Sequence, residues 1–207
     1  MLQRLLQLRP FAYHTCSALN FSSIRRARAL KSSAELLVGT QHESLLIVRR
    51  KQSRVVAVPS GQVEVRDNLP LRVGSLKLEA GCTLEQFLLL LNQRVFLWPG
   101  SELGPCKPGP DHFAHYQGAG PVHILRVPLA ELVAENPERE LEVTFCNSGS
   151  ARHHGGFPVV RGPSTFVTAR GASRPASEVK ELCFPGFAAL PRGTAWATSL
   201  AGPWRPL

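Results

Sequence analysis

The chain has 207 residues, 43% of them hydrophobic and 19% charged, with a formal net charge of +9 at pH 7. This length and composition allow one sizeable core and argue against two independent domains. The five cysteines are far apart and form no Cys-x-x-Cys pair, so neither a disulfide framework nor a zinc-ribbon pattern is supported. The longest apolar run, Phe87 to Leu91, is too short to cross a bilayer. We therefore expect a cytoplasmic protein with reduced thiols.

The positive charge is concentrated at the two ends of the sequence. Ten Lys and Arg stand against two acidic residues over residues 1–54, seven against eleven over 55–147, and seven against two over 148–207. Separated basic segments favour a polyanionic partner, either a nucleic acid or the phosphates of a nucleotide, because Coulomb attraction steers such encounters. A solubilising surface is the alternative, and the composition does not choose between them.

The N-terminal segment has two interpretations. The first acidic residue is Glu35, and the preceding stretch is rich in Arg, Leu and Ser, as mitochondrial transit peptides are. Against a transit peptide, Tyr13-His14-Thr15 and the helical pattern after it indicate folded structure. We expect a single domain over residues 11–207 and leave residues 1–10 open between an ordered and a disordered segment.

The first third of the chain predicts short elements. Tyr13-His14-Thr15 is expected on a first strand. Asn20 is expected to cap the first helix, and Ser32 or Ser33 the second. Helices are expected over residues 21–29 and 34–38, and strands over residues 44–48 and 54–58.

The clearest local signal is Thr83-Leu84-Glu85-Gln86, a capping box before an apolar run. It predicts a helix over 84–91. Residues 94–98 then predict a strand that Pro99-Gly100 stops, and a loop rich in Pro and Gly is expected over 99–110.

The last part of the chain predicts mostly strands. Pro128 is expected in the first turn of a short helix over 129–135, and a loop is expected over 147–156. The strands are expected at 122–127, 141–145, 164–168 and 179–184. Because helices cluster early and strands late, the fold class predicted is α+β rather than alternating β-α-β units.

Several functional classes lack their motifs. There is no Walker loop, no Gly-x-Gly-x-x-Gly and no Gly-x-Ser-x-Gly. His112 and His115 are three residues apart, but we expect them in a loop with only Asp111 nearby, so surface histidines are favoured over a metal site. A helix-turn-helix would place Arg25, Arg26 and Arg28 on an exposed face, yet the strand-rich remainder fits that fold poorly. No metal is predicted.

Six runs of the sequence resemble a known family. They are YHTCSALNFSSIRRARALKSS, RDNLP, LNQRVFLWPG, NSG, STF and KEL. In order and spacing they resemble the DarT-like ADP-ribosyltransferase fold, in particular an uncharacterised bacterial branch of it, over roughly residues 11 to 190. The resemblance implies a split antiparallel sheet with short helices that binds NAD as a substrate.

The resemblance also implies site residues. Glu181 would be the carboxylate at the reacting centre, and Arg66 would hold the pyrophosphate of NAD through charge-assisted hydrogen bonds. The tyrosine that many family members carry on a second strand has no clear match here. The catalytic pair would be Glu181 and Arg66, and the NAD-binding residues His14, Thr15, Arg66, Phe96 and Trp98.

Each assignment has a structural alternative. His14 can be a structural strand histidine, Arg66 can pair with Asp67 or Glu64, and Glu181 can face solvent beside Lys180. If the resemblance holds, a further expectation follows for the basic cluster, which should line one rim of the pocket that contains His14. That cluster is Arg49, Arg50, Lys51 and Arg54.

The leading hypothesis is an NAD-dependent transferase that moves ADP-ribose onto an acceptor, with a nucleic-acid base as the acceptor if the resemblance extends that far. The resemblance also implies that an antitoxin or another inhibitor protein restrains such an activity. The alternatives are a non-catalytic nucleotide- or nucleic-acid-binding module and a basic nucleic-acid-binding protein unrelated to NAD.

Overall fold

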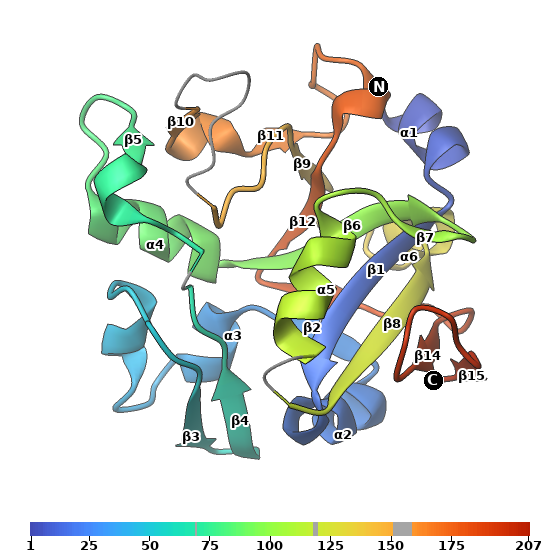
Figure 1. Cartoon of the computed structure of the whole chain (residues 1–207), viewed down its shortest axis with the longest axis horizontal. Coiled ribbons are helices and arrows are strands. Elements are labelled where there is room, and N and C mark those ends of the chain that lie inside the picture. Colours follow the sequence, from blue (N-terminus) through green and yellow to red (C-terminus); the bar gives the residue numbers. More distant parts are fainter. Residues whose placement is uncertain (69, 118–119, 151–158) are drawn as a thin grey trace.

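A long antiparallel sheet runs through the middle of the molecule (Figure 1). The computed structural model describes residues 1–68, 70–117, 120–150 and 159–207. Within them the sheet has nine strands: eight follow the order β11-β9-β12-β6-β1-β8-β14-β15, and the ninth, β7, pairs with β6 beside this path. The strands of this sheet are β1 (Phe11–Ser17), β6 (Arg94–Ser101), β7 (Gly104–Pro105), β8 (Val122–Pro128), β9 (Glu142–Thr144), β11 (Val167–Thr168), β12 (Glu181–Pro185), β14 (Ala195–Ala197) and β15 (Arg205–Pro206).

Short helices and smaller strand pairs surround this sheet. The small pairs are β2 (Ala29–Lys31) with β13 (Phe187–Ala189), β3 (Arg54–Val58) with β4 (Gly61–Val65), and β5 (Lys77–Leu78) with β10 (Val160–Arg161). The helices are α1 (Leu2–Leu8), α2 (Ala18–Ala27), α3 (Ser33–Leu37), α4 (Leu84–Asn92), α5 (Gly109–Gln117) and α6 (Leu129–Glu135), with 3-10 turns η1 (Glu43–Leu46), η2 (Val73–Ser75), η3 (Pro163–Thr165) and η4 (Ala176–Glu178). The predicted α+β class, an antiparallel sheet with several short helices, is therefore correct.

Strand β6 changes its partner along its length. Its first four residues pair with β12, ending at Leu97 opposite Leu182. From Trp98, which lies opposite Tyr13, it pairs with β1 instead. The sheet thus opens between β1 and the first half of β6, directly after Tyr13.

Strand β12 contributes to two different core clusters, one on each of its faces. Leu182 and Phe184 of β12 point into the largest cluster, together with Leu5 of α1 and Leu132 of α6. Cys183, between them in sequence, points the other way into a smaller cluster under α4. This follows from the two-residue period of a strand, which sends successive side chains to opposite faces.

Two of the helix predictions are confirmed by their caps. Thr83 Oγ1 accepts from Gln86 N at 3.2 Å, and Gln86 Oε1 accepts from Thr83 N at 2.8 Å, so the capping box begins α4 as expected. Ser32 caps α3 by accepting from Glu35 N at 3.1 Å.

The expected cap of the first helix is wrong. Ser17 caps α2, and its Oγ accepts from Asn20 N at 3.3 Å. The side chain of Asn20 instead pairs with the backbone of Glu64, donating to its carbonyl oxygen and accepting from its N–H, both at 2.8 Å. A contact 44 residues along the chain therefore takes the side chain that local sequence assigns to a cap.

Several strand and loop boundaries differ from expectation. Residues 54–58 form β3 as predicted, but 44–48 do not form a strand, because η1 covers most of them. Strand β6 continues through Pro99-Gly100, where a side chain in place of Gly100 would come within 2.3 Å of Gly104 O. The predicted loop over 99–110 contains β7 and the start of α5, so His112 and His115 lie on a helix.

The later elements agree more closely. The strand over 122–127 is β8, and the helix over 129–135 is α6, although Pro128 is its cap rather than part of its first turn. The strands expected at 141–145, 164–168 and 179–184 are shorter in the structure, as β9, β11 and β12. Part of the loop expected at 147–156 lies outside the described residues. Near the N-terminus, α1 places Leu5 in the core with no exposed surface.

Candidate functional site

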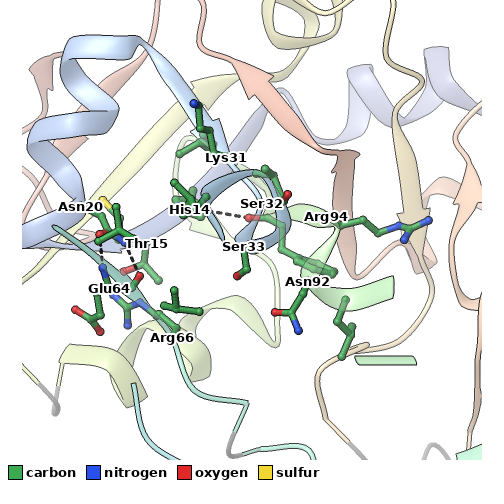
Figure 2. A pocket seen from close by; sticks show the side chains of 18 of the residues that line it. His14, Thr15, Asn20, Lys31, Ser32, Ser33, Glu64, Arg66, Asn92 and Arg94 are labelled. Atoms are coloured by element: carbon green, nitrogen blue, oxygen red, sulfur yellow. Dashed lines mark hydrogen bonds between the residues drawn. The ribbon is translucent and has the colours of Figure 1, made fainter. Parts of the chain in front are cut away.

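A cavity of about 370 Å³ lies where β1 and β6 separate. Its volume falls in the range of small-molecule sites, roughly 300–1,000 Å³. Strands β1, β4, β6 and β12 and helices α2 and α5 contribute to its wall (Figure 2). All six residues predicted from the sequence line it: His14, Thr15, Arg66, Phe96, Trp98 and Glu181.

His14 is fixed in one tautomer at the gap in the sheet. Its Nδ1 lies 2.8 Å from Phe96 O, a carbonyl that only accepts, so Nδ1 carries the hydrogen. Burial, together with the Arg66 charge, lowers the pKa of His14 from 6.5 to about 4. At neutral pH the ring is uncharged, and Nε2 is a hydrogen-bond acceptor for a hydroxyl or amide.

Arg66 carries a charge into the cavity that no ion pair neutralises in the described part of the chain. Its guanidinium carbon lies 3.9 Å from the centre of the Tyr116 ring, and its buried Nη2 has no hydrogen-bond partner. Arg66 belongs to neither of the ion pairs Arg94–Glu142 and Arg174–Glu178, and its guanidinium stacks on Tyr116. A half-buried guanidinium with an unpartnered nitrogen is well suited to an anionic ligand.

Two more buried polar atoms in the cavity wall have no hydrogen-bond partner among the described residues. They are the hydroxyl oxygens of Thr15, which is 6% exposed, and Ser148, which is 1% exposed. Buried polar groups are almost always hydrogen-bonded, so each such group calls for an explanation. A ligand that offers hydroxyl or phosphate oxygens would satisfy both.

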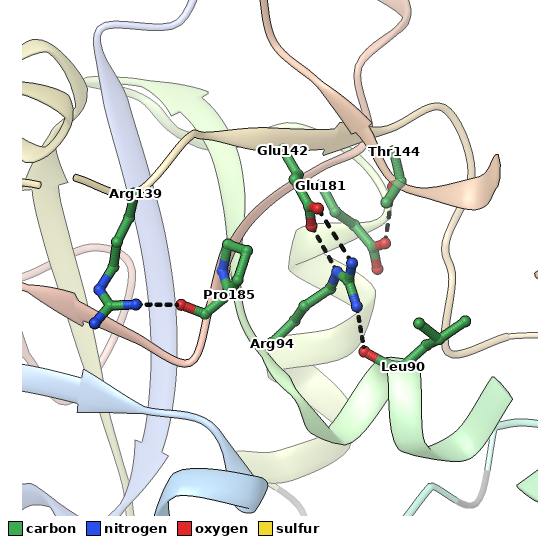
Figure 3. Close-up of polar contacts among 7 residues, drawn as sticks. All are labelled: Leu90, Arg94, Arg139, Glu142, Thr144, Glu181 and Pro185. Carbon is green, nitrogen blue, oxygen red and sulfur yellow. Dashed lines mark hydrogen bonds and ion pairs between the residues drawn. The ribbon is translucent and has the colours of Figure 1, made fainter. Parts of the chain in front are cut away.

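Glu181 is enclosed rather than facing solvent, with 3% of its surface exposed. Its Oε2 accepts from Ser148 N at 3.0 Å and lies 2.8 Å from Thr144 Oγ1 (Figure 3). Burial raises its pKa, against the opposing effects of Ser148, Thr144 and Arg161. The structural alternative of a solvent-facing strand residue is wrong.

The neighbouring ion pair is separate from Glu181. Arg94 donates from Nε to Glu142 Oε2 at 2.6 Å and from Nη1 to Leu90 O at 2.8 Å, as Figure 3 shows. Its charge is thus already satisfied by Glu142, although Arg94 lines the cavity. Glu181, which also lines the cavity, takes no part in this ion pair.

Aromatic side chains form another part of the wall. Phe96 and Trp98 share one face of β6, since they alternate with the core residues Val95 and Leu97. Trp98 is packed deeply, with 5% exposed, and its ring centre lies 5.1 Å from that of His112.

Helix α5 adds His112 and Tyr116, one turn apart, with ring centres 4.6 Å from each other. Burial, with smaller effects from the charge of Arg66 and the nearby histidines, lowers the pKa of His112 to about 3. The described residues contain no group of three or more His, Cys, Asp or Glu that could hold a metal ion.

The prediction for the basic cluster is largely wrong. Of its four members only Arg50 lines the cavity. Arg50 is 7% exposed, and it donates from Nε to Arg66 O at 2.8 Å and from Nη2 to Asn92 Oδ1 at 2.9 Å. It therefore supports the segment that carries Arg66, and the other basic residues near it do not form a rim.

Comparison with known families gives one match, to a family of unknown function, over residues 10–189. The chain belongs to the DUF7002 family. The range shared with DUF7002 begins just before β1 and ends with β13, and it includes every residue of the candidate site. Helix α1 and strands β14 and β15 lie outside it.

No curated protein and no solved structure matches this DUF7002 member. None of the helices in the described ranges is long and apolar enough to cross a membrane.

Sequence reasoning missed four residues of the site: Ser148, Thr144, His112 and Tyr116. Ser148 lies in the Asn-Ser-Gly run that carries part of the family resemblance, but its sequence gives no hint that it contacts Glu181. The i, i+4 spacing of His112 and Tyr116 becomes informative only when 109–117 is known to be a helix. Pro108 and Pro110 at its start concealed that helix.

Proposed function

We propose that the protein is an NAD-dependent transferase that moves ADP-ribose from NAD onto an acceptor. The observation that carries the proposal is that His14, Arg66 and Glu181, far apart in sequence, line one cavity. A chance gathering of these residue types from three distant segments would be unusual, and perturbed ionisable groups in a cleft favour a functional site.

The cavity suits the parts of NAD. The unpaired guanidinium of Arg66 matches the charge of a pyrophosphate. The unpartnered Thr15 hydroxyl and the acceptor Nε2 of His14 match ribose hydroxyls. Phe96, beside them, offers an apolar surface to the nicotinamide ring.

The chemistry follows from the charges. The bond between the nicotinamide nitrogen and the ribose carbon C1′ breaks, and nicotinamide leaves neutral with the electron pair of that bond. Positive charge develops on the ribose, and the ionised Glu181 carboxylate stabilises it. The acceptor nucleophile then bonds to C1′, and its proton passes to Glu181.

The proposed acceptor is a nucleic-acid base. The proposed location of the protein is the cytoplasm, where NAD and nucleic acid are both present. The net charge of +9 supports a polyanionic acceptor, because phosphate contacts dominate the affinity of basic proteins for nucleic acids. A protein that inhibits the transferase remains part of the same proposal.

The test is transfer of label from NAD carrying labelled adenylate. Purified protein is incubated with duplex DNA, single-stranded DNA, RNA or a protein mixture, alongside Glu181→Gln and Arg66→Ala. We expect transfer to at least one acceptor, a loss of roughly 100-fold or more in Glu181→Gln, and NAD binding weakened by about tenfold or more in Arg66→Ala.

Matched controls come from exposed residues of the same type. Glu138→Gln and Arg72→Ala change residues that lie on the surface away from the cavity, and both should behave as the unchanged protein. NAD binding without transfer to any acceptor would replace the enzyme by the non-catalytic nucleotide-binding module. No binding of NAD would exclude both.

A further inference from the structure

The turn that holds Glu181 is itself held by a buried arginine that the proposed chemistry does not use. Arg161 is 1% exposed. Its Nη2 donates to the carbonyl oxygens of Asn147 at 3.1 Å and Ser150 at 3.0 Å, which are the two ends of a turn. Between them, Ser148 N donates to Glu181 Oε2.

Among the described residues, the guanidinium of Arg161 donates to backbone carbonyls and to no side chain. Its Nη1 donates to Val159 O at 2.9 Å, and its buried Nε has no partner. Arg161 belongs to neither of the ion pairs Arg94–Glu142 and Arg174–Glu178. A buried cation outside any ion pair is more costly than an apolar residue that packs in the same place, which indicates a role for Arg161 beyond packing.

The turn leaves Glu181 under two opposing influences. Thr144 has one hydroxyl proton for two acceptors, Cys146 O at 2.7 Å and Glu181 Oε2 at 2.8 Å, an arrangement that a protonated carboxyl would relieve. The Ser148 N–H and the positive charge of Arg161 favour the ionised form.

We propose that Arg161 is a positioning residue, which fixes the turn over residues 147–150 and thereby holds the Glu181 carboxylate in place and ionised for the cleavage of NAD. The catalytic part of this inference rests on the proposed function. The effect on the carboxyl group itself does not, and it can be measured without any turnover.

The experiment compares Arg161→Met and Arg161→Lys with the unchanged protein. Arg192→Met is the matched control, because Arg192 is exposed and its replacement removes the same charge. Two quantities are measured: the titration of the Glu181 carboxyl carbon by 13C NMR, assigned by its loss in Glu181→Gln, and the pH dependence of kcat for NAD.

In Arg161→Met we expect the Glu181 carboxyl to titrate at a higher pH, and the acid limb of kcat to move up with it. At pH values below the shifted limb, kcat of Arg161→Met should be about tenfold lower than that of the unchanged protein, while KM for NAD changes by less than about threefold. Arg161→Lys keeps the charge but not the forked geometry, so its carboxyl titration and its kcat should lie between those of Arg161→Met and the unchanged protein. Arg192→Met should match the unchanged protein.

An unshifted carboxyl titration in folded Arg161→Met would overturn the inference. If that variant does not fold, Arg161→Lys decides: a kcat equal to that of the unchanged protein counts against a positioning role. If the unchanged protein does not turn over NAD, the proposed function fails, and the carboxyl titration still shows whether Arg161 controls Glu181.

Discussion

His14 illustrates how one residue can be placed by sequence while its chemical state is not. Its position on β1 was predicted, and the motif around it suggested contact with NAD. The bond from its Nδ1 to Phe96 O, which fixes the tautomer, exists only because β6 changes partner beside it. At this scale the environment decides whether an imidazole is an acid, a base or a neutral acceptor.

The lowered pKa of His14 predicts a dependence of stability on pH. Between its unfolded value of 6.5 and its folded value of about 4, the unfolded chain binds more protons at this site, so stability falls as pH falls through that window. His14→Asn should reduce this dependence by on the order of 3 kcal/mol between pH 7 and pH 4. Urea unfolding at several pH values measures it.

The pH dependence of the unchanged protein does not isolate His14, because Glu181 changes the stability with pH in the opposite direction. The comparison with His14→Asn separates the two contributions. Its raised pKa makes the folded protein bind more protons, so its contribution to stability decreases as pH rises from 4.5. The same pH slope in His14→Asn and in the unchanged protein would show that His14 does not titrate as stated.

Among the elements, the β3–β4 hairpin is notable because it pairs with no other strand of the described sheets. It lies away from the large sheet in Figure 1, yet residues of β4 line the cavity. The side chain of Asn20 binds the backbone of Glu64 by two hydrogen bonds, as a neighbouring strand would. A single amide thus joins α2 to the hairpin.

Asn20→Ala should loosen this hairpin. Both hydrogen bonds to Glu64 are lost, so hydrogen exchange over residues 61–65 should become at least about tenfold faster, as expected for a local loss of 1–3 kcal/mol. Asn20→Asp keeps the acceptor and loses the donor, and its exchange should be intermediate. Equal exchange in all three proteins would mean that the hairpin is held by packing alone.

Helix α1 is a second element with a testable contribution. Leu5 has no exposed surface and packs in the largest core cluster, although the sequence left residues 1–10 undecided. Leu5→Ala should lower the free energy of unfolding by about 2–5 kcal/mol. Leu103→Ala, at a side chain that is 98% exposed, should leave it unchanged in the same denaturation experiment.

On the scale of the whole molecule, only some of the basic residues lie at the cavity. The basic residues of 49–54 do not surround the cavity, since only Arg50 reaches it, and that residue is buried. Arg26 and Lys31, from α2 and β2, do line it. The basic N-terminal part of the sequence therefore reaches the site mainly through the segment before residue 35, and the basic C-terminal part contributes no Lys or Arg to the described lining.

The proposed nucleic-acid acceptor predicts a strong dependence of binding on salt. Binding of a short DNA duplex should weaken by roughly tenfold or more between 50 and 200 mM NaCl, because counterions released from the phosphates set the affinity. Arg26→Gln with Lys31→Gln should reduce that dependence, and Arg192→Gln with Arg72→Gln, at exposed positions outside the cavity, should reduce it less. Fluorescence anisotropy measures both. Binding that does not respond to salt would argue against a polyanionic acceptor.

The sequence by itself determined the features that depend on residues close together in the chain. The Thr83–Gln86 capping box, the β8 strand with α6 after it, and the alternation that puts Phe96 and Trp98 on one face of β6 all depend on residues a few positions apart. The family resemblance added the identities of the site residues. These signals were sufficient for the α+β class.

Tertiary structure alone decided the cavity and the states of its residues. The gap in the sheet arises where β6 exchanges β12 for β1, and the burial of Glu181 depends on a turn 33 residues earlier that Arg161 holds. Asn20 leaves its expected cap because Glu64 offers a better pair of bonds. Such contacts join distant segments, and no local pattern encodes them, because their free energy exists only once the whole chain is packed.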